Sequence, residues 1–414
     1  MTAMNMHRIR FMALLVQSCF VASMMAATGP DDTWTQWRGH DAAGRISTLP
    51  DGVPSFKRLW KQPVAGECFS GPVIKGPRVI LTDHGKGFDR VSALSIDDGS
   101  VLWSNTYTNT AEISFGSGPR TTPLILDNKV FVMNALGVTR CLDLASGKQH
   151  WRTPTDTNMP TWGFCGSPLV ADGKLLLCGA AQNGPVAAYR PDDGKRLWAA
   201  HDSSMVNYAT FLPGTFGGVR QVIGYDDASL GGWSLDNGQR LWKHNVDTLE
   251  GYICPMPCAL GEGLLITTPA DGARLFGFAP DGTLNDSVLS SSDAIFPEMT
   301  APTVLGDLVF GSGELLTCLD AANGLATLWT LEHDELYGEI SVIAEPRRLF
   351  AFCDGYAAMI DYDRQSATTV AGQKLCEETY SHPAIAQGRV IVRDSAFIYC
   401  YDLRAAPAGT TPKP

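Results

Sequence analysis

Short apolar segments, separated by tight-turn residues, follow one another along almost the whole chain. The stretch TTPLILDNKVFVM, which begins at Thr121, places an Asp-Asn turn between two apolar runs, and SGPVIKGPRVIL at Ser70 has the same form. Paired apolar runs around such a turn predict a β-hairpin. Eight hairpins are predicted in all, and the other six begin at Gly166, Ala209, Met256, Thr300, Ile340 and Ser381.

A second phrase follows the hairpins and carries a turn glycine and, in most copies, a tryptophan. ALSIDDGSVLW runs from Ala93 to Trp103, and CLDLASGKQHW runs from Cys141 to Trp151. Successive copies are separated by roughly 45 residues, which is the length of one four-stranded propeller blade. The turn glycines are Gly99, Gly147, Gly194, Gly238, Gly282 and Gly324, and a degenerate seventh copy, MIDYDRQSATT, lies near Ser366.

The two ends of the chain complete each other in this repeat. The eighth copy stops after three strands at FIYCYDLR, Phe397 to Arg404, and the missing fourth strand is present near the other end as FKRLWKQPV, Phe56 to Val64. Pairing these segments would close the ring and remove its free sheet edges. We therefore predict an all-β, eight-bladed propeller of four-stranded blades over residues 56–404. A stack of β-solenoid turns, the alternative, predicts no blade divided between the two ends.

The tryptophans of the repeat are predicted to be structural. Each would lie on an outer strand and pack between neighbouring blades, where an indole buries about 150 to 250 Å². A tryptophan box for a ligand is the alternative, but recurrence at one position of the repeat favours packing. Blades five and seven lack this tryptophan, so looser interfaces are expected there. The six residues are Trp60, Trp103, Trp151, Trp198, Trp242 and Trp329.

The first 27 residues have the form of a secretory signal. A basic segment with Arg8 and Arg10 precedes an apolar run, and Ala27 offers a cleavage point. Export to the periplasm or the outside of the cell is expected, and a lipid anchor at Cys19 is the alternative. No later run reaches the roughly 20 apolar residues of a membrane span. Residues 28–55 are predicted to be a lead-in, and residues 405–414 a disordered tail.

Charge and composition limit the classes of partner. The formal net charge is -11, and charged residues make up 18% of the chain. An acidic surface disfavours nucleic acid and anionic membranes as partners. We therefore expect a monomer whose partner is an envelope protein or a small ligand.

The repeated phrases resemble the pyrroloquinoline-quinone (PQQ) repeat of the quinoprotein alcohol dehydrogenase-like superfamily. The likeness is strongest where Asp143, Gly147 and Trp151 occupy the positions of the repeat, and TWTQWRG at Thr33 is similar to the lead-in of secreted members. The resemblance implies the propeller fold. It leaves activity open, because the superfamily includes quinone-dependent dehydrogenases and non-catalytic scaffolds such as the lipoprotein subunit of the outer-membrane barrel-assembly machinery.

The resemblance also implies which residues a quinone-dependent dehydrogenase would need. Such members hold PQQ with Ca²⁺, an arginine, an aromatic stacking surface and a carboxylate base, and many add a ring of two adjacent cysteines. This chain has no adjacent pair of cysteines and no compact run of acidic residues, although Ca²⁺ takes roughly six to eight oxygen ligands. We therefore predict no catalytic residue and no metal ligand.

One face of the predicted ring gathers aromatic and acidic side chains. The loop before the innermost strand of each blade would emerge at the mouth of the central channel, and each of these eight loops carries an aromatic residue. Concave sites with aromatic side chains and a few polar groups are where ligands bind, whereas throat packing and turn formation are the structural alternatives. Arg120 is expected to contact an anionic group, with a salt bridge as its alternative role. The predicted ligand or partner face comprises Glu67, Phe69, Phe115, Arg120, Trp162, Tyr208, Tyr252, Phe296, Glu298, Tyr337, Glu339 and Tyr380.

Ten cysteines would remain after export, an even number in an oxidising compartment. Cys254 and Cys258 could pair locally, while Cys68 and Cys165 would lie near the channel mouth. No pair of Cys-x-x-Cys motifs supports a metal site. The spacing leaves the disulfide connectivity open.

Together these observations favour an exported, non-catalytic propeller that serves as a binding platform or scaffold for a protein or small ligand in the cell envelope. The alternative is a PQQ- and Ca²⁺-dependent quinoprotein dehydrogenase that oxidises an alcohol or a sugar. The two differ in whether the central face holds PQQ and calcium.

Overall fold

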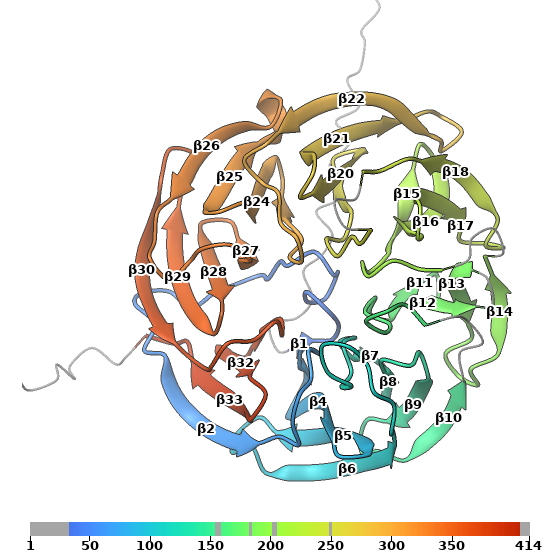
Figure 1. Cartoon of the computed structure of the whole chain (residues 1–414). Coiled ribbons are helices and arrows are strands. Elements are labelled where there is room, and N and C mark those ends of the chain that lie inside the picture. Colours follow the sequence, from blue (N-terminus) through green and yellow to red (C-terminus); the bar gives the residue numbers. More distant parts are fainter. Residues whose placement is uncertain (1–32, 154–158, 182–183, 201–204, 248–250, 406–414) are drawn as a thin grey trace, which may run out of the picture.

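The chain folds into a closed ring of eight antiparallel sheets, as Figure 1 shows. The predicted all-β, eight-bladed propeller is therefore confirmed. None of the helical segments in the described residues is long or apolar enough to cross a membrane. The predicted signal segment and residues 406–414 of the predicted tail lie outside the described residues. This computed structural model describes residues 33–153, 159–181, 184–200, 205–247 and 251–405.

Each blade begins with a strand near the centre of the ring and ends with a strand at the rim. Blade 1 comprises β3 (Val73–Lys75), β4 (Arg78–Gly85), β5 (Phe88–Ser95) and β6 (Val101–Thr108), with β1 (Thr33–Trp34) added inside β3. Blade 2 comprises β7 (Leu124–Leu126), β8 (Lys129–Met133), β9 (Thr139–Asp143) and β10 (Gln149–Thr153). Blade 3 comprises β11 (Leu169–Ala171), β12 (Lys174–Ala181), β13 (Gly184–Tyr189) and β14 (Arg196–Ala199). Blade 4 comprises β15 (Leu212–Phe216), β16 (Val219–Tyr225), β17 (Leu230–Ser234) and β18 (Arg240–His244).

The second half of the ring repeats the arrangement. Blade 5 comprises β19 (Cys258–Leu260), β20 (Gly263–Thr268), β21 (Gly272–Phe278) and β22 (Leu284–Ser292). Blade 6 comprises β23 (Thr303–Leu305), β24 (Leu308–Ser312), β25 (Leu316–Asp320), the 3-10 turn η1 (Ala321–Asn323) and β26 (Ala326–Leu331). Blade 7 comprises β27 (Ser341–Glu345), β28 (Arg348–Cys353), β29 (Tyr356–Tyr362) and β30 (Ala367–Lys374). Blade 8 comprises β31 (Ala384–Ala386), β32 (Arg389–Arg393), β33 (Phe397–Asp402) and β2 (Lys57–Pro63).

The N-terminal strand β2 closes the ring by completing blade 8. It runs antiparallel to β33, with Lys57 opposite Asp402 and Pro63 opposite Phe397. The predicted sharing of the last blade between the two ends of the chain is thus confirmed. The pairing covers the edge that β33 would otherwise expose.

Tryptophans of the outer strands join neighbouring blades. Trp103 of blade 1 donates its indole N–H to the Leu144 carbonyl oxygen of blade 2 at 3.0 Å. The ring lies against Gly147, whose φ of 70° is a left-handed conformation that glycine adopts without strain. Blades 1, 2 and 3 thus each supply a ring and receive one on their own turn glycine. The same bond to a carbonyl oxygen of the next blade is made, at 2.9 to 3.0 Å, by Trp60, Trp151, Trp198 and Trp329.

Trp242 of blade 4 departs from this pattern. Its indole N–H donates to Gln221 Oε1 in the same blade at 2.6 Å, and Gln221 Nε2 donates to the Gly282 carbonyl oxygen of blade 5 at 2.9 Å. Blade 5 has no tryptophan in its outer strand. A Cβ on Gly324, the turn glycine of blade 6, would meet only Ser290 Oγ, at 3.9 Å. The turn glycine at the junction of blades 5 and 6 therefore has no aromatic ring against it, unlike Gly147.

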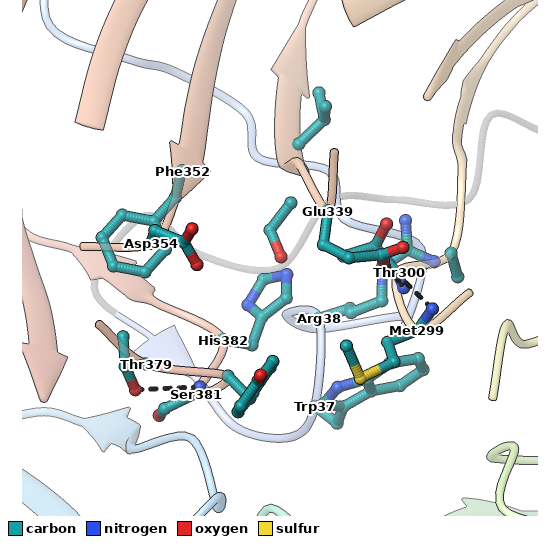
Figure 2. A pocket seen from close by; sticks show the side chains of 14 residues that line it. Trp37, Arg38, Met299, Thr300, Glu339, Phe352, Asp354, Thr379, Ser381 and His382 are labelled. Carbon is teal, nitrogen blue, oxygen red and sulfur yellow. Dashed lines mark hydrogen bonds between the residues drawn. The ribbon is translucent and has the colours of Figure 1, made fainter. Parts of the chain in front are cut away.

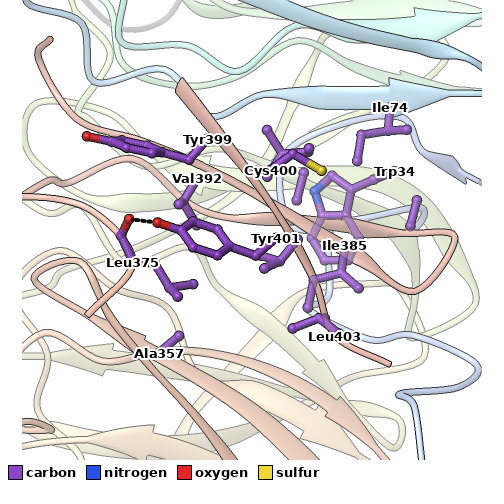
Figure 3. Close-up of a cluster of buried hydrophobic side chains, with 14 of the residues drawn as sticks. Trp34, Ile74, Ala357, Leu375, Ile385, Val392, Tyr399, Cys400, Tyr401 and Leu403 are labelled. Atoms are coloured by element: carbon purple, nitrogen blue, oxygen red, sulfur yellow. Dashed lines mark hydrogen bonds between the residues drawn. The ribbon is translucent and has the colours of Figure 1, made fainter. Parts of the chain in front are cut away.

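Figure 3 shows the apolar core at the junction where the ring closes. Trp34 from the lead-in, Ile74 of blade 1 and Ile385 of blade 8 belong to one buried cluster. The buried hydroxyl of Tyr401 donates to the Leu375 carbonyl oxygen, so its polar atom is satisfied. Apolar burial, worth about 25 cal/mol per Å², therefore joins the lead-in to both sides of the closure.

The lead-in crosses the ring before it reaches the first complete strand, and Figure 1 shows this blue segment at the centre of the ring. After β1, Arg38 donates to the Pro302 carbonyl oxygen of blade 6 at 2.7 Å. Gly44 then accepts a backbone hydrogen bond from Ala344 of blade 7 at 2.8 Å. The lead-in thus links blade 1 to blades 6 and 7 across the central channel, a course that the repeat does not predict.

Candidate functional site

A cavity of about 670 Å³ lies at the centre of the ring, on the face where the loops before the innermost strands emerge. Seven of the eight blades and the lead-in contribute to its wall, which no single repeat could form alone. The lining residues are Trp37, Glu67, Phe69, Phe115, Gly116, Arg120, Thr122, Trp162, Cys165, Ser167, Tyr208, Thr210, Tyr252, Cys254, Glu298, Met299, Tyr380 and His382.

Most residues of the predicted face meet in this cavity. Glu339 lies in a smaller chamber beside it. Phe296 and Tyr337 line neither space, and they are 37% and 59% exposed. That the gathered residues act together in binding stays a prediction. The nine that line the cavity are Glu67, Phe69, Phe115, Arg120, Trp162, Tyr208, Tyr252, Glu298 and Tyr380.

Three aromatic side chains from consecutive blades form the Trp162 cluster, which comprises Trp162, Tyr208 and Tyr252. The ring centroid of Trp162 lies 5.0 Å from that of Tyr208 and 5.0 Å from that of Tyr252. Phe115 of blade 2 meets Trp162 edge-on at 5.7 Å. Tilted and edge-on contacts at these distances are favourable for aromatic rings. The loops of blades 2 to 5 are therefore joined into one aromatic wall.

Arg120 holds the loop that presents Phe115. Its guanidinium donates to the carbonyl oxygens of Ser114 at 3.1 Å, Gly116 at 2.7 Å and Gly118 at 2.7 Å. Phe115 lies between two of these acceptors, has a φ of 61° and is 76% exposed. A left-handed bulky residue is strained and persists only where its surroundings impose it. The position of Arg120 therefore explains how an exposed ring is kept at the cavity mouth.

Glu339 fixes the neighbouring loop of blade 6. Its carboxylate accepts the backbone N–H groups of Glu298, Met299 and Thr300 at 2.8, 3.0 and 2.7 Å. Figure 2 shows Glu339 beside Met299 and Thr300 at the edge of the smaller chamber, whose volume is about 90 Å³. Glu339 thus positions Glu298 and Met299 at the large cavity.

His382 lines both the cavity and the chamber, and Figure 2 shows its imidazole among the chamber residues. Burial, with a smaller contribution from the charge of Arg38, lowers the pKa of His382 to about 3. Nδ1 lies 2.7 Å from the Pro383 carbonyl oxygen and therefore carries the proton. Nε2 is left as a buried acceptor with no partner among the described residues. The rings of Trp34 and Trp37 lie 6.0 and 6.5 Å from the imidazole.

The ten cysteines of the described chain are free thiols, so the local pairing considered for Cys254 and Cys258 is not formed. Cys165 and Cys254 line the cavity. Burial raises the pKa of Cys165 to about 12 and is the main cause of a raised pKa at Cys254. Both thiols are therefore protonated and neutral near neutral pH. Since the thiolate is the reactive form of cysteine, they serve as wall residues of the cavity.

No sequence pattern marks Trp37 and His382 as cavity residues. Trp37 belongs to the lead-in, which lies outside the repeat, and His382 sits one residue into a predicted hairpin. The structure brings them together because the lead-in crosses the channel next to blade 8. The two tryptophans of TWTQWRG are the one sequence feature that could have indicated a packing contact of the lead-in.

These features define an eight-bladed β-propeller whose own N-terminal segment crosses the channel and whose loops build an aromatic cavity. A family model described as outer membrane protein assembly factor BamB matches residues 87–251. The resemblance inferred from the repeat is confirmed: over these residues the chain is similar to propellers of the PQQ-repeat and BamB type.

Individual relatives are distant. BamB of Yersinia pestis is 25% identical over 233 residues, 54% of each chain, and BamB of Burkholderia pseudomallei is 26% identical over 283 residues, 63% of this chain and 66% of that protein. The chain thus spans about half to two thirds of the length of these curated relatives. Among solved structures, BamB of Moraxella catarrhalis has a TM-score of 0.60 at 15% identity, over 84% of this chain and 98% of that chain. A quinohemoprotein alcohol dehydrogenase of Comamonas testosteroni has a TM-score of 0.63 at 14% identity, over 94% of this chain and 83% of that chain. These structures support the fold alone.

Proposed function

We propose that this protein is an exported, non-catalytic binding platform of the cell envelope, which holds a protein or a small ligand in its central aromatic cavity. The cavity carries the proposal, because seven aromatic side chains line about 670 Å³, and ligand sites typically measure about 300 to 1,000 Å³. The similarity to outer membrane protein assembly factors and the signal-like first 27 residues support a place in the envelope.

The polar side chains around the cavity bind the protein's own backbone and so have a structural role. Arg120 is bound to three backbone carbonyl oxygens, and Glu339 is bound to three backbone N–H groups. The thiols of Cys165 and Cys254 have raised pKa values because they are buried. These groups shape the loops and the wall, which favours binding over acid–base or nucleophilic catalysis.

The residues present do not fit PQQ with Ca²⁺. A calcium site requires roughly six to eight oxygen ligands, and the described residues contain no group of three or more His, Cys, Asp or Glu side chains placed to hold a metal ion. The N–H groups that Arg120 would offer to an anionic quinone are largely taken by Ser114, Gly116 and Gly118. The dehydrogenase alternative is therefore the weaker one.

Affinity capture from a detergent-solubilised envelope fraction tests the platform. Trp162→Leu and Tyr252→Leu remove rings from the cavity, whereas Tyr337→Leu removes an exposed ring outside it. We expect proteins or small molecules bound by the wild type to be retained by Tyr337→Leu and reduced at least about fivefold by the cavity variants. Equal recovery with all four proteins would show that the cavity is not the binding site.

A second experiment tests the alternative. The purified chain is titrated with PQQ in the presence of Ca²⁺, and absorbance and thermal unfolding are recorded. We expect no saturable change. Saturable binding together with alcohol- or sugar-dependent dye reduction would overturn the non-catalytic proposal.

A further inference from the structure

We propose that the cavity recognises a cationic side chain, arginine or lysine, carried on an exposed segment of a partner protein and bound between Glu298 and the Trp162 cluster. The inference rests on the proposed function, since it takes the cavity as the partner's binding site. It goes further by naming the chemical group that enters.

The aromatic wall is suited to a positive charge. Trp162, Tyr208 and Tyr252 all line the cavity, and the centroids of both tyrosine rings lie 5.0 Å from that of the indole. The electron-rich faces of tryptophan and tyrosine attract ammonium and guanidinium groups within about 6 Å of the ring centroid. Arg120 illustrates this in the same cavity, because its Cζ lies 5.2 Å from the Phe69 ring centroid.

Glu298 supplies an unneutralised negative charge near Cys254. Its carboxylate makes no hydrogen bond or ion pair with any residue in the described parts of the chain. The adjacent Glu339 adds a second negative charge, although three backbone N–H groups offset it. The field of both carboxylates reaches the cavity wall, since both contribute, after burial and Cys165, to the raised pKa of Cys254.

The cavity's own cation does not neutralise this charge. Arg120 belongs to blade 2 and is held by three carbonyl oxygens of its own loop, where Glu67 is the nearby carboxylate. Glu298 belongs to blade 6. Arg120 and Glu67 therefore offset each other on one side, and Glu298 stays uncompensated on the other.

Other ligand chemistries match this arrangement less well. A phosphate or carboxylate would be repelled by the uncompensated charge of Glu298, which lines the cavity. A neutral apolar group would use the rings but leave the carboxylate of Glu298 without a partner. An arginine or lysine side chain satisfies both, because its apolar stem packs on rings while its charged end meets the carboxylate.

The test uses labelled nine-residue peptides of glycine and serine with one central arginine, and the same peptides with citrulline in its place. Citrulline keeps the shape and loses the charge. We expect the full-length protein to bind the arginine peptides at least about fivefold more tightly at low salt, with the difference shrinking at about 0.5 M salt. Fluorescence anisotropy measures both affinities.

Matched variants locate the charge. Glu298→Gln should weaken arginine binding by up to about fivefold and leave citrulline binding unchanged, whereas Glu378→Gln, an exposed glutamate of blade 8 outside the cavity, should change neither. Glu298 is exposed, so its substitution leaves folding intact. Trp162→Leu should weaken both peptides and arginine more.

Equal affinity for arginine and citrulline peptides would overturn the inference. So would binding of tetramethylammonium without binding of the arginine peptides, since the cation would then not come from a protein. If Trp162→Leu abolishes capture of envelope proteins while arginine and citrulline remain equivalent, the platform stands and only the cationic chemistry fails.

Discussion

The indole of Trp103 lies on the backbone of Gly147, so close that a Cβ at Gly147 would stand 2.3 Å from Trp103 Cε3. The two residues belong to different blades and to different copies of one phrase. Glycine suits this position for two reasons. Gly147 has a φ of 70°, and the Trp103 ring of the neighbouring blade leaves no room for a Cβ. This contact makes the packing of blade 1 depend on the sequence of blade 2.

Gly147→Ala is expected to destabilise the ring strongly. The left-handed conformation costs about 1–2 kcal/mol for a residue with a Cβ, and the clash with Trp103 adds about 1–3 kcal/mol. Gly173→Ala is the control, because Gly173 has a φ of 67° and nothing within 4 Å of an added Cβ. Urea unfolding should show a loss of about 3 kcal/mol for Gly147→Ala and about 1 kcal/mol for Gly173→Ala. Equal losses would mean that the indole contact adds nothing.

Arg120→Lys should behave like Arg120→Met. Lysine keeps the positive charge but lacks the planar fork that reaches three carbonyl oxygens at once. We expect both variants to lose about 1–2 kcal/mol of unfolding free energy and to shift the NMR signals of the Phe115 loop. If lysine restored both properties, the charge of Arg120 rather than its geometry would be the functional feature, as the anion-binding role expected from the sequence requires.

The neutral state of His382 should make stability depend on pH. Its pKa is about 3 in the folded protein, against an ordinary value of 6.5 that applies to the unfolded chain. Below pH 6.5 the unfolded chain binds a proton that the folded chain does not, so stability falls as the pH drops, by about 1.4 kcal/mol per unit. Between pH 6.5 and about pH 5 the wild type should lose about 2 kcal/mol more than His382→Gln in urea titrations. Parallel pH profiles would contradict this assignment.

Arg38→Met should loosen the contact between the lead-in and blade 6. The buried guanidinium donates to the Pro302 carbonyl oxygen and to Thr303 Oγ1, each at 2.7 Å. Leaving a buried acceptor without a donor costs about 1–3 kcal/mol. Hydrogen exchange of residues 300–305 should accelerate. Arg404→Met, which removes an exposed ion pair with Asp402, is the control and should change stability by less than about 1 kcal/mol. Unchanged exchange in Arg38→Met would show that the lead-in is held by other contacts.

The number of blades and the closure of the ring could be predicted because they are repeated or complementary in sequence. The last copy of the repeat ends after three strands with FIYCYDLR, and FKRLW near the other end is the missing fourth strand. Alternating apolar residues define the individual strands. The positions of most cavity aromatics followed from the same register. The direction of each side chain could not be predicted in this way. The Phe296 ring packs on Gly313, where a Cβ would be 2.3 Å from the ring, and Phe296 therefore lies outside the cavity.

The remaining features depend on contacts that occur once. The lead-in has no second copy to reveal its course, so Trp37 and Arg38 could not be placed at the channel. Trp242 occupies the same repeat position as the other tryptophans, but its indole N–H donates to Gln221 of its own blade. The other blades have no glutamine at the position of Gln221. Repetition thus predicts architecture, while the site is shaped by its exceptions.

The pairing of β2 with β33 also sets the order in which the molecule can be finished. β2 is the second and β33 the last of the strands along the described part of the chain, so the eighth blade cannot form until β33 has been synthesised. A shortened chain would carry an unsatisfied strand that invites proteolysis or aggregation. Ring closure therefore depends on every strand from β2 to β33 being present in one chain.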